Sequence, residues 1–423
     1  MKYPTTLIFI ILFISQNIVT AKSDSTQNIK LYINCNADNC FENYLKMELN
    51  YFDFVRDRLQ SDIEIIVISM DNGAGGLNYK LLFNGRNTFE NLKDTLELST
   101  KQTDTDDLVR EKILKAIQIG LIPYLKKSKI LYIIDISYPK RDMNKALVQN
   151  DKWRNWVFTL SGNGYVNAES NQTNLNLGSF LDINKIKHEI KFQNSIYYYS
   201  SYYRFVFSNN DNESNKTITA QNVNYGASSF LAKSISAHWA AGAYISVLSS
   251  QRQNVIFQST IAPAIEYNLF PISENAERQF RFIFQSGYRT WKLNEVNNYN
   301  KLNEAEPFNR LDIVINYIKS WGNISMQLGA NHFYNRKSSY NISGNLSASL
   351  RIFEGFNFNI SMSSSYIQDQ DIYLPKNIIE TNVLLGTGIL PTNFNIYSFF
   401  GLSYTFGSIN NSVVNPRLEE AIW

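Results

Sequence analysis

Two cysteines and three histidines are the side chains in this sequence best suited to redox chemistry, metal binding or catalysis. Cys35 and Cys40 lie close together in "NCNADNC", and the histidines are His188, His238 and His332. Two thiols without a nearby histidine make only half of a zinc site, and a redox pair more usually has the C-x-x-C spacing. We favour a local disulfide for the two cysteines, with a metal half-site as the alternative.

Three glycines, Gly73, Gly75 and Gly76, could indicate a phosphate-binding loop. Such a loop needs a following Lys-Ser/Thr pair, or a G-x-G-x-x-G spacing that opens a helix, and neither is present. The glycines lie instead between two predicted strands, "DIEIIVISM" and "NYKLLF", and therefore favour a hairpin turn. We expect no cofactor.

The N-terminus has the pattern of a secretory signal peptide over residues 1–21. Lys2 is followed by an apolar run from Leu7 to Ile14, and Val19-Thr20-Ala21 is an acceptable cleavage site. An uncleaved anchor is the alternative, although the run is too short to cross a bilayer as a helix. Export would place the cysteines in an oxidising compartment. The rest of the chain has no apolar run of helix-spanning length, so a membrane form would have to cross as strands.

The composition narrows the class of protein further. Charged residues make up 18% of the chain, below the usual quarter, while tyrosine (26) and phenylalanine (27) are abundant. A net charge of +3 is too near balance to indicate nucleic-acid binding. Few charges with many aromatic and small polar residues suit a membrane barrel, and also a secreted all-β protein.

Residues 22–150 are predicted to form a small two-layer α/β domain. Strands are expected at "NIKLYIN", "DIEIIVISM", "NYKLLF" and "KILYIIDIS", and helices at "FENYLKMELNYFDFVRDRL" and "TDTDDLVREKILKAIQIGLIPYL". The second helix has an acidic start, which suits the positive end of the helix dipole. Leu108, Ile113, Ile117 and Leu121 are predicted to form its buried stripe.

Residues 151–408 alternate between apolar and small polar residues with a period of two. In "FGLSYTF", Phe400, Leu402 and Tyr404 face one side, and Gly401 and Ser403 face the other. We predict twelve such strands, with starts near Trp156, Asn174, Glu189, Thr217, His238, Ile256, Gln279, Asn309, Asn323, Asn341, Phe356 and Phe394. Short turns such as "SWGN" and "FEGF" should lie at the periplasmic end, and long loops, including residues 368–393, at the other. The turn "PISENAER" is long for the periplasmic end, and "SSQRQN" is short for the other end.

The polar faces of these strands carry charges of both signs, as expected in the wet lumen of a barrel. The predicted lumen charges are Glu266, Arg281, Arg289, Asp312 and Arg351. The apolar faces are nearly free of charge along the strand centres, as lipid contact requires. The predicted fold is multidomain: a small α/β periplasmic domain, an antiparallel transmembrane β-barrel of about twelve strands, and a C-terminal tail over residues 409–423.

The chain resembles an uncharacterised class of outer-membrane barrels from Bacteroidetes, which pair an N-terminal α/β module with a barrel similar to the salt-induced outer-membrane proteins. The resembling stretches are "YFDFVRDR", "APAIEYNLFP" and "GLSYTFGSINNSVVNPR". This chain departs from the pattern at its end, where "LEEAIW" follows "NPR". The resemblance implies an outer-membrane location with the N-terminal domain in the periplasm, and it supplies no catalytic residues.

Three functions remain open from the sequence. The first, which we favour, is a non-enzymatic barrel that contacts outer-membrane lipid and acts as a narrow pore or an envelope scaffold. A periplasmic protein partner could then bind its N-terminal domain. The second is a lipid-modifying barrel enzyme, for which His332 is the only candidate, and its neighbouring strands offer no serine on the same face. The third is a soluble adhesin glycosylated at Asn-x-Ser/Thr triplets, such as that at Asn171.

Overall fold

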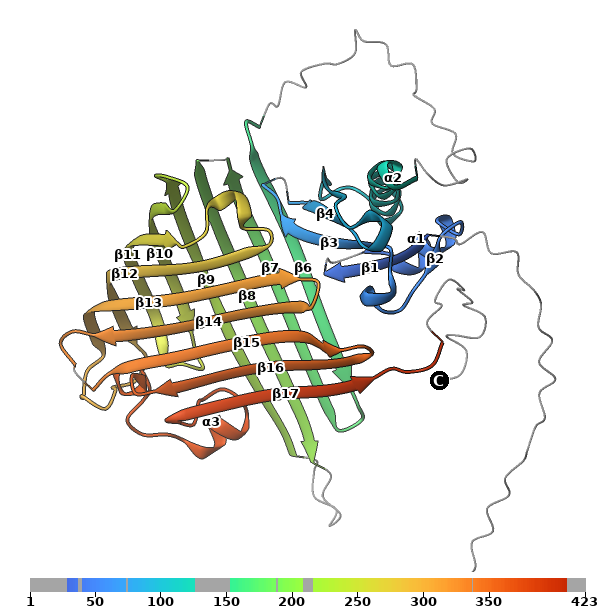
Figure 1. Cartoon of the computed structure of the whole chain (residues 1–423). Helices are drawn as coiled ribbons and strands as arrows, with labels where there is room; N and C mark the ends of the chain where they lie inside the picture. Colours follow the sequence, from blue (N-terminus) through green and yellow to red (C-terminus); the bar gives the residue numbers. More distant parts are fainter. Residues whose placement is uncertain are drawn as a thin grey trace, which may run out of the picture.

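The computed structural model describes residues 29–36, 40–73, 75–125, 153–187, 189–207, 216–336 and 338–408. The predicted signal peptide, the strand expected at "KILYIIDIS" and the tail 409–423 lie outside these ranges. The described residues form a small α/β domain and a large curved antiparallel sheet (Figure 1). Among their helices, none has the length and apolar character needed to cross a membrane.

The small domain is a five-stranded sheet with two helices on one face. Its elements are β1 (Lys30–Asn36), α1 (Glu42–Glu48), β2 (Asp53–Phe54), η1 (Arg58–Gln60), β3 (Ile63–Asp71), β4 (Leu77–Gly85), η2 (Asn87–Phe89), β5 (Lys93–Ser99) and α2 (Asp106–Leu125). The strand order is β2-β1-β3-β4-β5. β1 runs parallel to β2 and β3, whereas β3, β4 and β5 pair in antiparallel fashion. The glycines of residues 73–76 lie in the β3–β4 hairpin, as predicted.

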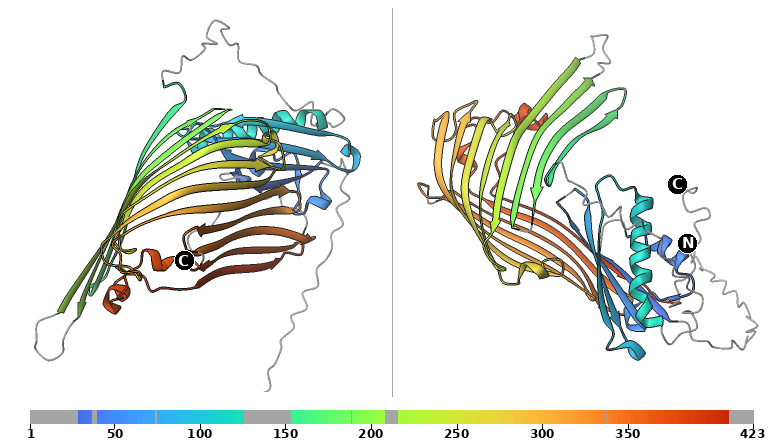
Figure 2. Two further views of the ribbon diagram at one scale, coloured as in Figure 1. Left: turned by 90° about the vertical axis from the view of Figure 1, so that its left-hand side faces the viewer. Right: turned by 90° about the horizontal axis from the view of Figure 1, so that it is seen from above.

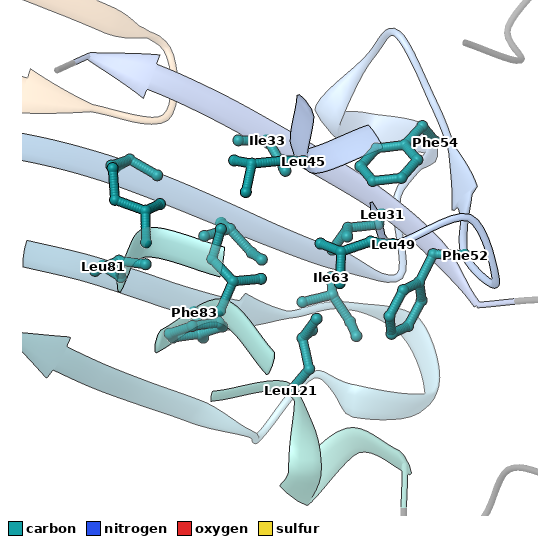
Figure 3. Close-up of a cluster of buried hydrophobic side chains, with 14 of the residues drawn as sticks. Leu31, Ile33, Leu45, Leu49, Phe52, Phe54, Ile63, Leu81, Phe83 and Leu121 are labelled. Carbon is teal, nitrogen blue, oxygen red and sulfur yellow. The ribbon is translucent and has the colours of Figure 1, made fainter. Parts of the chain in front are cut away.

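Leucine, isoleucine and phenylalanine side chains from the strands and both helices form the core of this domain (Figure 3). Each fully buried side chain of this size stabilises a fold by about 1.5–3 kcal/mol. The predicted stripe on α2 is corrected at its first position, because Leu108 is 41% exposed and Val109 is buried instead. Val109 stands four residues before Ile113, which places both on the same face of the helix.

The first helix is shorter than predicted. It ends at Glu48, and the following residues Phe52 and Phe54 are both buried in the core. These two phenylalanines stand two positions apart, and that period belongs to an extended chain. Asp53 and Phe54 accordingly pair with β1 as the edge strand β2. β5 was not predicted, because "KDTLELS" offers little apolar character.

The large sheet contains twelve strands in chain order, each hydrogen-bonded to the next. They are β6 (Trp156–Ala168), β7 (Gln172–Ile186), β8 (Ile190–Phe207), β9 (Lys216–Ser234), β10 (Trp239–Ser250), β11 (Val255–Asn268), β12 (Arg278–Leu293), β13 (Asn303–Lys319), β14 (Gly322–Phe333), β15 (Tyr340–Phe353), β16 (Phe356–Ile367) and β17 (Phe394–Tyr404). All but one begin within two residues of the predicted start. The exception is β13, which begins at Asn303 instead of Asn309.

This sheet curls strongly, so that β6–β9 lie behind the later strands in Figure 1 and the sheet is open when seen from above in Figure 2. Within the described residues, the two end strands β6 and β17 are not hydrogen-bonded to each other. β6 runs away from the small domain and β17 runs back towards it. The two edges therefore have the antiparallel directions that closure of a twelve-stranded barrel requires.

Two ends of the sheet can be distinguished by the position of the small domain. We call the end beside this domain the inner mouth and the opposite end the outer mouth. Inner connections include the tight turns at residues 320–321 and 354–355 and the longer segment 269–277. Outer connections include residues 294–302, 334–339 and 368–393, and the last holds η6 (Gln370–Ile372) and α3 (Glu380–Leu384).

Candidate functional site

The predicted lumen charges share the inward face of the large sheet but do not form one network. Glu266 on β11 and Arg281 on β12 come together, with Oε2 of the carboxylate 3.7 Å from Nη1 of the guanidinium. Both side chains are partly exposed. This pair is the only direct contact that the structure makes among the five predicted charges within the described ranges.

Asp312 pairs along its own strand, with Arg310. Oδ2 accepts a hydrogen bond from Nε at 2.7 Å, and Oδ1 accepts one from Nη2 at 2.6 Å. The pair fits because Gly329 lies opposite Asp312 on β14; a Cβ there would stand 2.7 Å from Oδ1 of Asp312. Sequence reasoning missed Arg310, although it stands two residues from Asp312 and so shares its face.

Arg289 lies against aromatic rings. Its Nε donates to Oγ1 of Thr260 at 3.1 Å, and its guanidinium carbon lies 4.9 Å from the ring centre of Phe308. Arg351, the fifth predicted charge, leaves the lumen altogether. Its guanidinium donates to the hydroxyl of Tyr32 in the small domain and lies 4.9 Å from the centre of that ring.

Part of the long outer connection packs against the inward face of the sheet at the outer mouth. We call residues 368–376 the outer plug. Ile372 in this segment is fully buried, and Leu374 is nearly so. Ile372 packs within a cluster of buried side chains, and the members contributed by the sheet are Val255, Ala262, Trp291, Leu293, Phe308 and Phe333. Because these residues project inward from β11–β14, the plug lies on the inward face of the sheet at this end.

Buried asparagines attach the outer plug to neighbouring loops. Nδ2 of Asn297 donates to the carbonyl of Ile372 at 2.7 Å and to Oε1 of Glu304 at 2.9 Å. Nδ2 of Asn254 donates to the carbonyl of Tyr373 at 3.1 Å and to that of Glu295 at 2.8 Å. Buried polar groups that lose such partners are costly, so these contacts fix the position of the plug.

A second ionic cluster, absent from the sequence predictions, lies at the same mouth. Arg336 contacts Glu304 at 2.7 Å and Glu306 at 2.8 Å, and both carboxylates are almost fully buried. Its guanidinium also lies 3.8 Å from the ring centre of Tyr299. Burial alone would lower the pKa of Arg336, but the hydrogen bonds and charges of these partners raise it above its usual range. Only the fold brings the loop residue Arg336 to Glu304 and Glu306 of β13, so spacing gave no signal.

Asp369 of the outer plug faces a small polar cavity of about 180 Å³, which Arg289 also lines. Its side chain is buried, and burial raises the pKa of this carboxyl although the charge of Arg289 opposes the shift. Arg289, one of the predicted lumen charges, and Asp369 of the plug therefore line the same cavity. The sequence could not place Asp369 there, because it lies in an irregular connection.

The inner mouth is covered by the small domain. Nζ of Lys80 lies 2.9 Å from Oε1 of Glu277, and Nζ of Lys319 lies 3.4 Å from Oε2 of the same carboxylate. Nη1 of Arg58 donates to Oγ of Ser320 at 3.0 Å. The long inner connection 269–277 thereby has a structural role, since it carries the glutamate that holds the domain.

Further contacts extend this docking to the other inner turns and to the end of β7. The backbone N–H of Gly355 donates to Oδ2 of Asp57 at 3.4 Å, and Gln60 bonds to Glu354. On the opposite side, Gly73 approaches Ile186 so closely that a Cβ would stand 2.8 Å from the Cβ of that isoleucine. The domain therefore reaches from β7 to β16 across the inner mouth.

The docked face of the small sheet is the one that the helices leave uncovered. Tyr32 and Lys80, which contact the barrel-like sheet, lie on this face, and so do Ile66 and Ile68, which are 4% and 1% exposed. α2 lies on the far side of the small sheet, away from the twelve strands (Figure 2). Among the described residues, the helical face is thus the one that the twelve strands leave uncovered.

Cys35 and Cys40 form a disulfide that links the end of β1 to the approach to α1. His188 lies outside the described residues. His238 is an inner-turn residue whose Nδ1 lies 2.8 Å from the carbonyl oxygen of Asn268. His332 lies on β14 opposite Asn309 and Tyr340, so neither directly paired residue is a serine.

Comparisons with known proteins give a likeness in structure. No family model matches the sequence, and no curated protein matches it. The translocator domain of the autotransporter NalP from Neisseria meningitidis is similar over 59% of this chain and 87% of its own, with 10% identity and a TM-score of 0.22. At this TM-score the likeness supports no argument about function, and membership of the Bacteroidetes class stays a prediction from the quoted motifs.

Proposed function

We propose that this chain is an outer-membrane β-barrel whose lumen is held closed at both mouths, and that it acts as a non-enzymatic envelope scaffold. The observation that carries the proposal is the pair of contacts at the two mouths: the outer plug packs on the inward face of the sheet at one, and the α/β domain docks at the other. Twelve strands leave a lumen only wide enough for side chains and short segments, so a plug and a docked domain suffice to block it.

The distribution of charge over the twelve strands supports the membrane location. All of their acidic residues face inward: Asp182, Glu266, Glu304, Glu306 and Asp312. The charged residues on the outward face are all cations, and each lies at or within a few residues of a strand end. They are Lys185, Arg204, Lys233, Arg278, Lys292 and Lys319. Charges at the bilayer centre are costly, whereas cations near the ends can reach the headgroups.

Strand length and exposed side chains agree with this orientation. The strands run from 11 residues in β17 to 19 in β9, and about 9–11 tilted residues cross a bilayer. On β12, outward Phe282, Phe284 and Tyr288 are exposed, while inward Trp291 and Leu293 are buried. Exposed aromatic residues on this face would contact lipid.

If the protein acts as a scaffold, a partner would bind the helical face of the small domain, because the other face of the small sheet is docked against the twelve strands. A partner in the periplasm would therefore contact α1 and α2. Of the histidines in the described ranges, His238 contacts a backbone carbonyl through its ring and His332 is paired with no serine on the neighbouring strands, whereas a nucleophile and its base must lie within hydrogen-bond reach.

Planar bilayer recording tests the closed lumen. Protein reconstituted into vesicles is first checked for a heat-modifiable gel shift, so that a silent bilayer cannot result from failed assembly. Wild-type protein should then show no steady conductance. Replacing both plug anchors, Asn254→Ala with Asn297→Ala, should produce opening events. Steady conductance of the wild type, with selectivity shifted towards cations by Arg281→Ala and Arg289→Ala, would instead establish a narrow pore.

A further inference from the structure

An apolar groove of about 720 Å³ runs along the outward face of β6–β10. Ala227 and Ser229 on β9 provide small side chains within it, and Phe192, Ile196 and Ile245 are larger apolar side chains beside them. On β8 the lining continues from Phe192 to Ile196, which is about 13 Å of strand at 3.3 Å per residue. The largely apolar lining of the groove suits a hydrocarbon chain.

Two cations lie where this groove meets the inner end of the sheet. Arg154 lines the groove and is exposed, and it directly precedes β6. Nζ of Lys185 lies 4.9 Å from the ring centre of Trp156, another lining residue. The outward face of the described strands has no acid to neutralise them. An apolar channel that ends beside these two cations is complementary to an acyl chain attached to a phosphate.

Aromatic rings reinforce the interfacial character of this end. Trp156 packs edge-on against Phe192, with ring centres 5.6 Å apart, and Trp153 packs against Phe158 at 5.7 Å. Tryptophan is enriched where hydrocarbon meets headgroups, because its ring is apolar and its N–H is polar. The cations and the aromatic cluster therefore occupy the headgroup level of the inner leaflet, and the groove extends from them towards the membrane centre.

We propose that this groove binds an anionic glycerophospholipid of the periplasmic leaflet, with one acyl chain in the groove and the phosphate held by Arg154 and Lys185. The inference rests on the proposed membrane location, since it needs the outward face to contact lipid. A zwitterionic lipid offers the same chain, but its headgroup carries a cation that these two side chains would repel. The site therefore discriminates by net charge of the headgroup.

Native mass spectrometry of detergent-purified full-length protein tests the site. Dioleoyl-phosphatidylglycerol and dioleoyl-phosphatidylcholine are added in turn, because they share acyl chains and differ in headgroup charge. The wild type should retain the phosphatidylglycerol more tightly. The double variant Arg154→Gln with Lys185→Gln should bind phosphatidylglycerol roughly 30-fold more weakly, since each cation near a membrane surface contributes about a factor of five. Phosphatidylcholine binding should hardly change.

Two further variants separate charge from groove. Lys292→Gln removes an outward cation of β12 at the outer end of the sheet, away from the groove. This variant should bind phosphatidylglycerol as the wild type does. Ala227→Trp fills the groove and should lower the binding of both lipids. Equal retention of the two lipids by wild-type protein, or equal losses in Lys292→Gln and the double variant, would overturn the proposal. A missing heat-modifiable gel shift would instead overturn the membrane location, so the two failures are distinguishable.

Discussion

Nζ of Lys80 lies 2.9 Å from Oε1 of Glu277, and this ion pair joins the α/β domain to the longest inner connection of the twelve-stranded sheet. Burial would raise the pKa of Glu277, but hydrogen bonds and charges from Lys80 and Lys319 hold it below its ordinary value. The domain is thus attached through a carboxylate that must be ionised. We therefore expect docking at the inner mouth to weaken in acid.

Lys80→Ala should loosen the docked domain by about 0.5–1 kcal/mol, because the pair is partly exposed to solvent. Ile68→Cys reports undocking, since this side chain lies beside Lys80 on the docked face. Its labelling by a water-soluble maleimide should speed up two- to fivefold in the Lys80→Ala background. Val67→Cys, on the helix-covered face, is the control and should label at an unchanged rate; equal acceleration of both would mean that the domain itself unfolds.

The pH dependence of docking follows from the direction of the shift at Glu277. A carboxyl with a lowered pKa stabilises the docked form above its ordinary value of 4.5 and loses this effect as the pH falls through the docked-state pKa. Near pH 7, the reporter cysteine of Ile68→Cys should therefore be labelled faster when Glu277→Gln is also present than when residue 277 is unchanged. The labelling rates of the two proteins should converge in acid. A difference between these rates that grows on acidification would contradict the role assigned to Glu277.

Asn297 should be the most sensitive anchor of the outer plug. Asn297→Ala removes hydrogen bonds to the carbonyl of Ile372 and to buried Glu304, and the loss should cost about 1–3 kcal/mol. The midpoint of the heat-induced gel shift should fall, and protease should cut within residues 377–393 more readily. Asn298→Ala, which removes one exposed contact with Asp371, is the matched control and should have little effect.

The alternation of faces on β15 predicts opposite outcomes for two adjacent substitutions. Leu346 lies at mid-strand on the outward face, opposite Met326 and Met362, and Ser347 faces the lumen. Leu346→Arg should cost about 2–4 kcal/mol at the membrane midplane and reduce the assembled fraction. Ser347→Arg should be tolerated better. Equal assembly of the two variants would show that the assignment of the lipid face is wrong.

The free edges of β6 and β17 should meet in the membrane, because an open sheet edge cannot face lipid. Asn163 on β6 and Phe399 on β17 both have inward parity. Asn163→Cys combined in turn with Tyr397→Cys, Phe399→Cys, Gly401→Cys or Ser403→Cys should give an oxidative cross-link at one or two neighbouring positions. Cross-links between chains instead of within one chain would show that the edges pair with a second copy.

The sequence predicted the large sheet well, because a period of two over ten or more residues is a strong local signal. It predicted the face of Arg351 correctly but could not predict its contact with Tyr32, since that contact depends on where a separate domain docks. The same limit applies to Arg336 and the buried acids at the outer mouth. The outer plug was missed because residues 368–376 have no regular period, and Ile372 is buried only by the sheet around it.

Fractionation followed by an unheated gel tests the central claim, a membrane-spanning barrel closed by its own chain, most directly. Outer membranes from expressing cells are extracted with high salt and alkaline carbonate and then solubilised in detergent. We predict that the protein stays in the membrane until detergent is added, and that it migrates faster unheated than after boiling. Release by salt or carbonate, with no difference between heated and unheated samples, would contradict the account and identify a soluble β-rich protein.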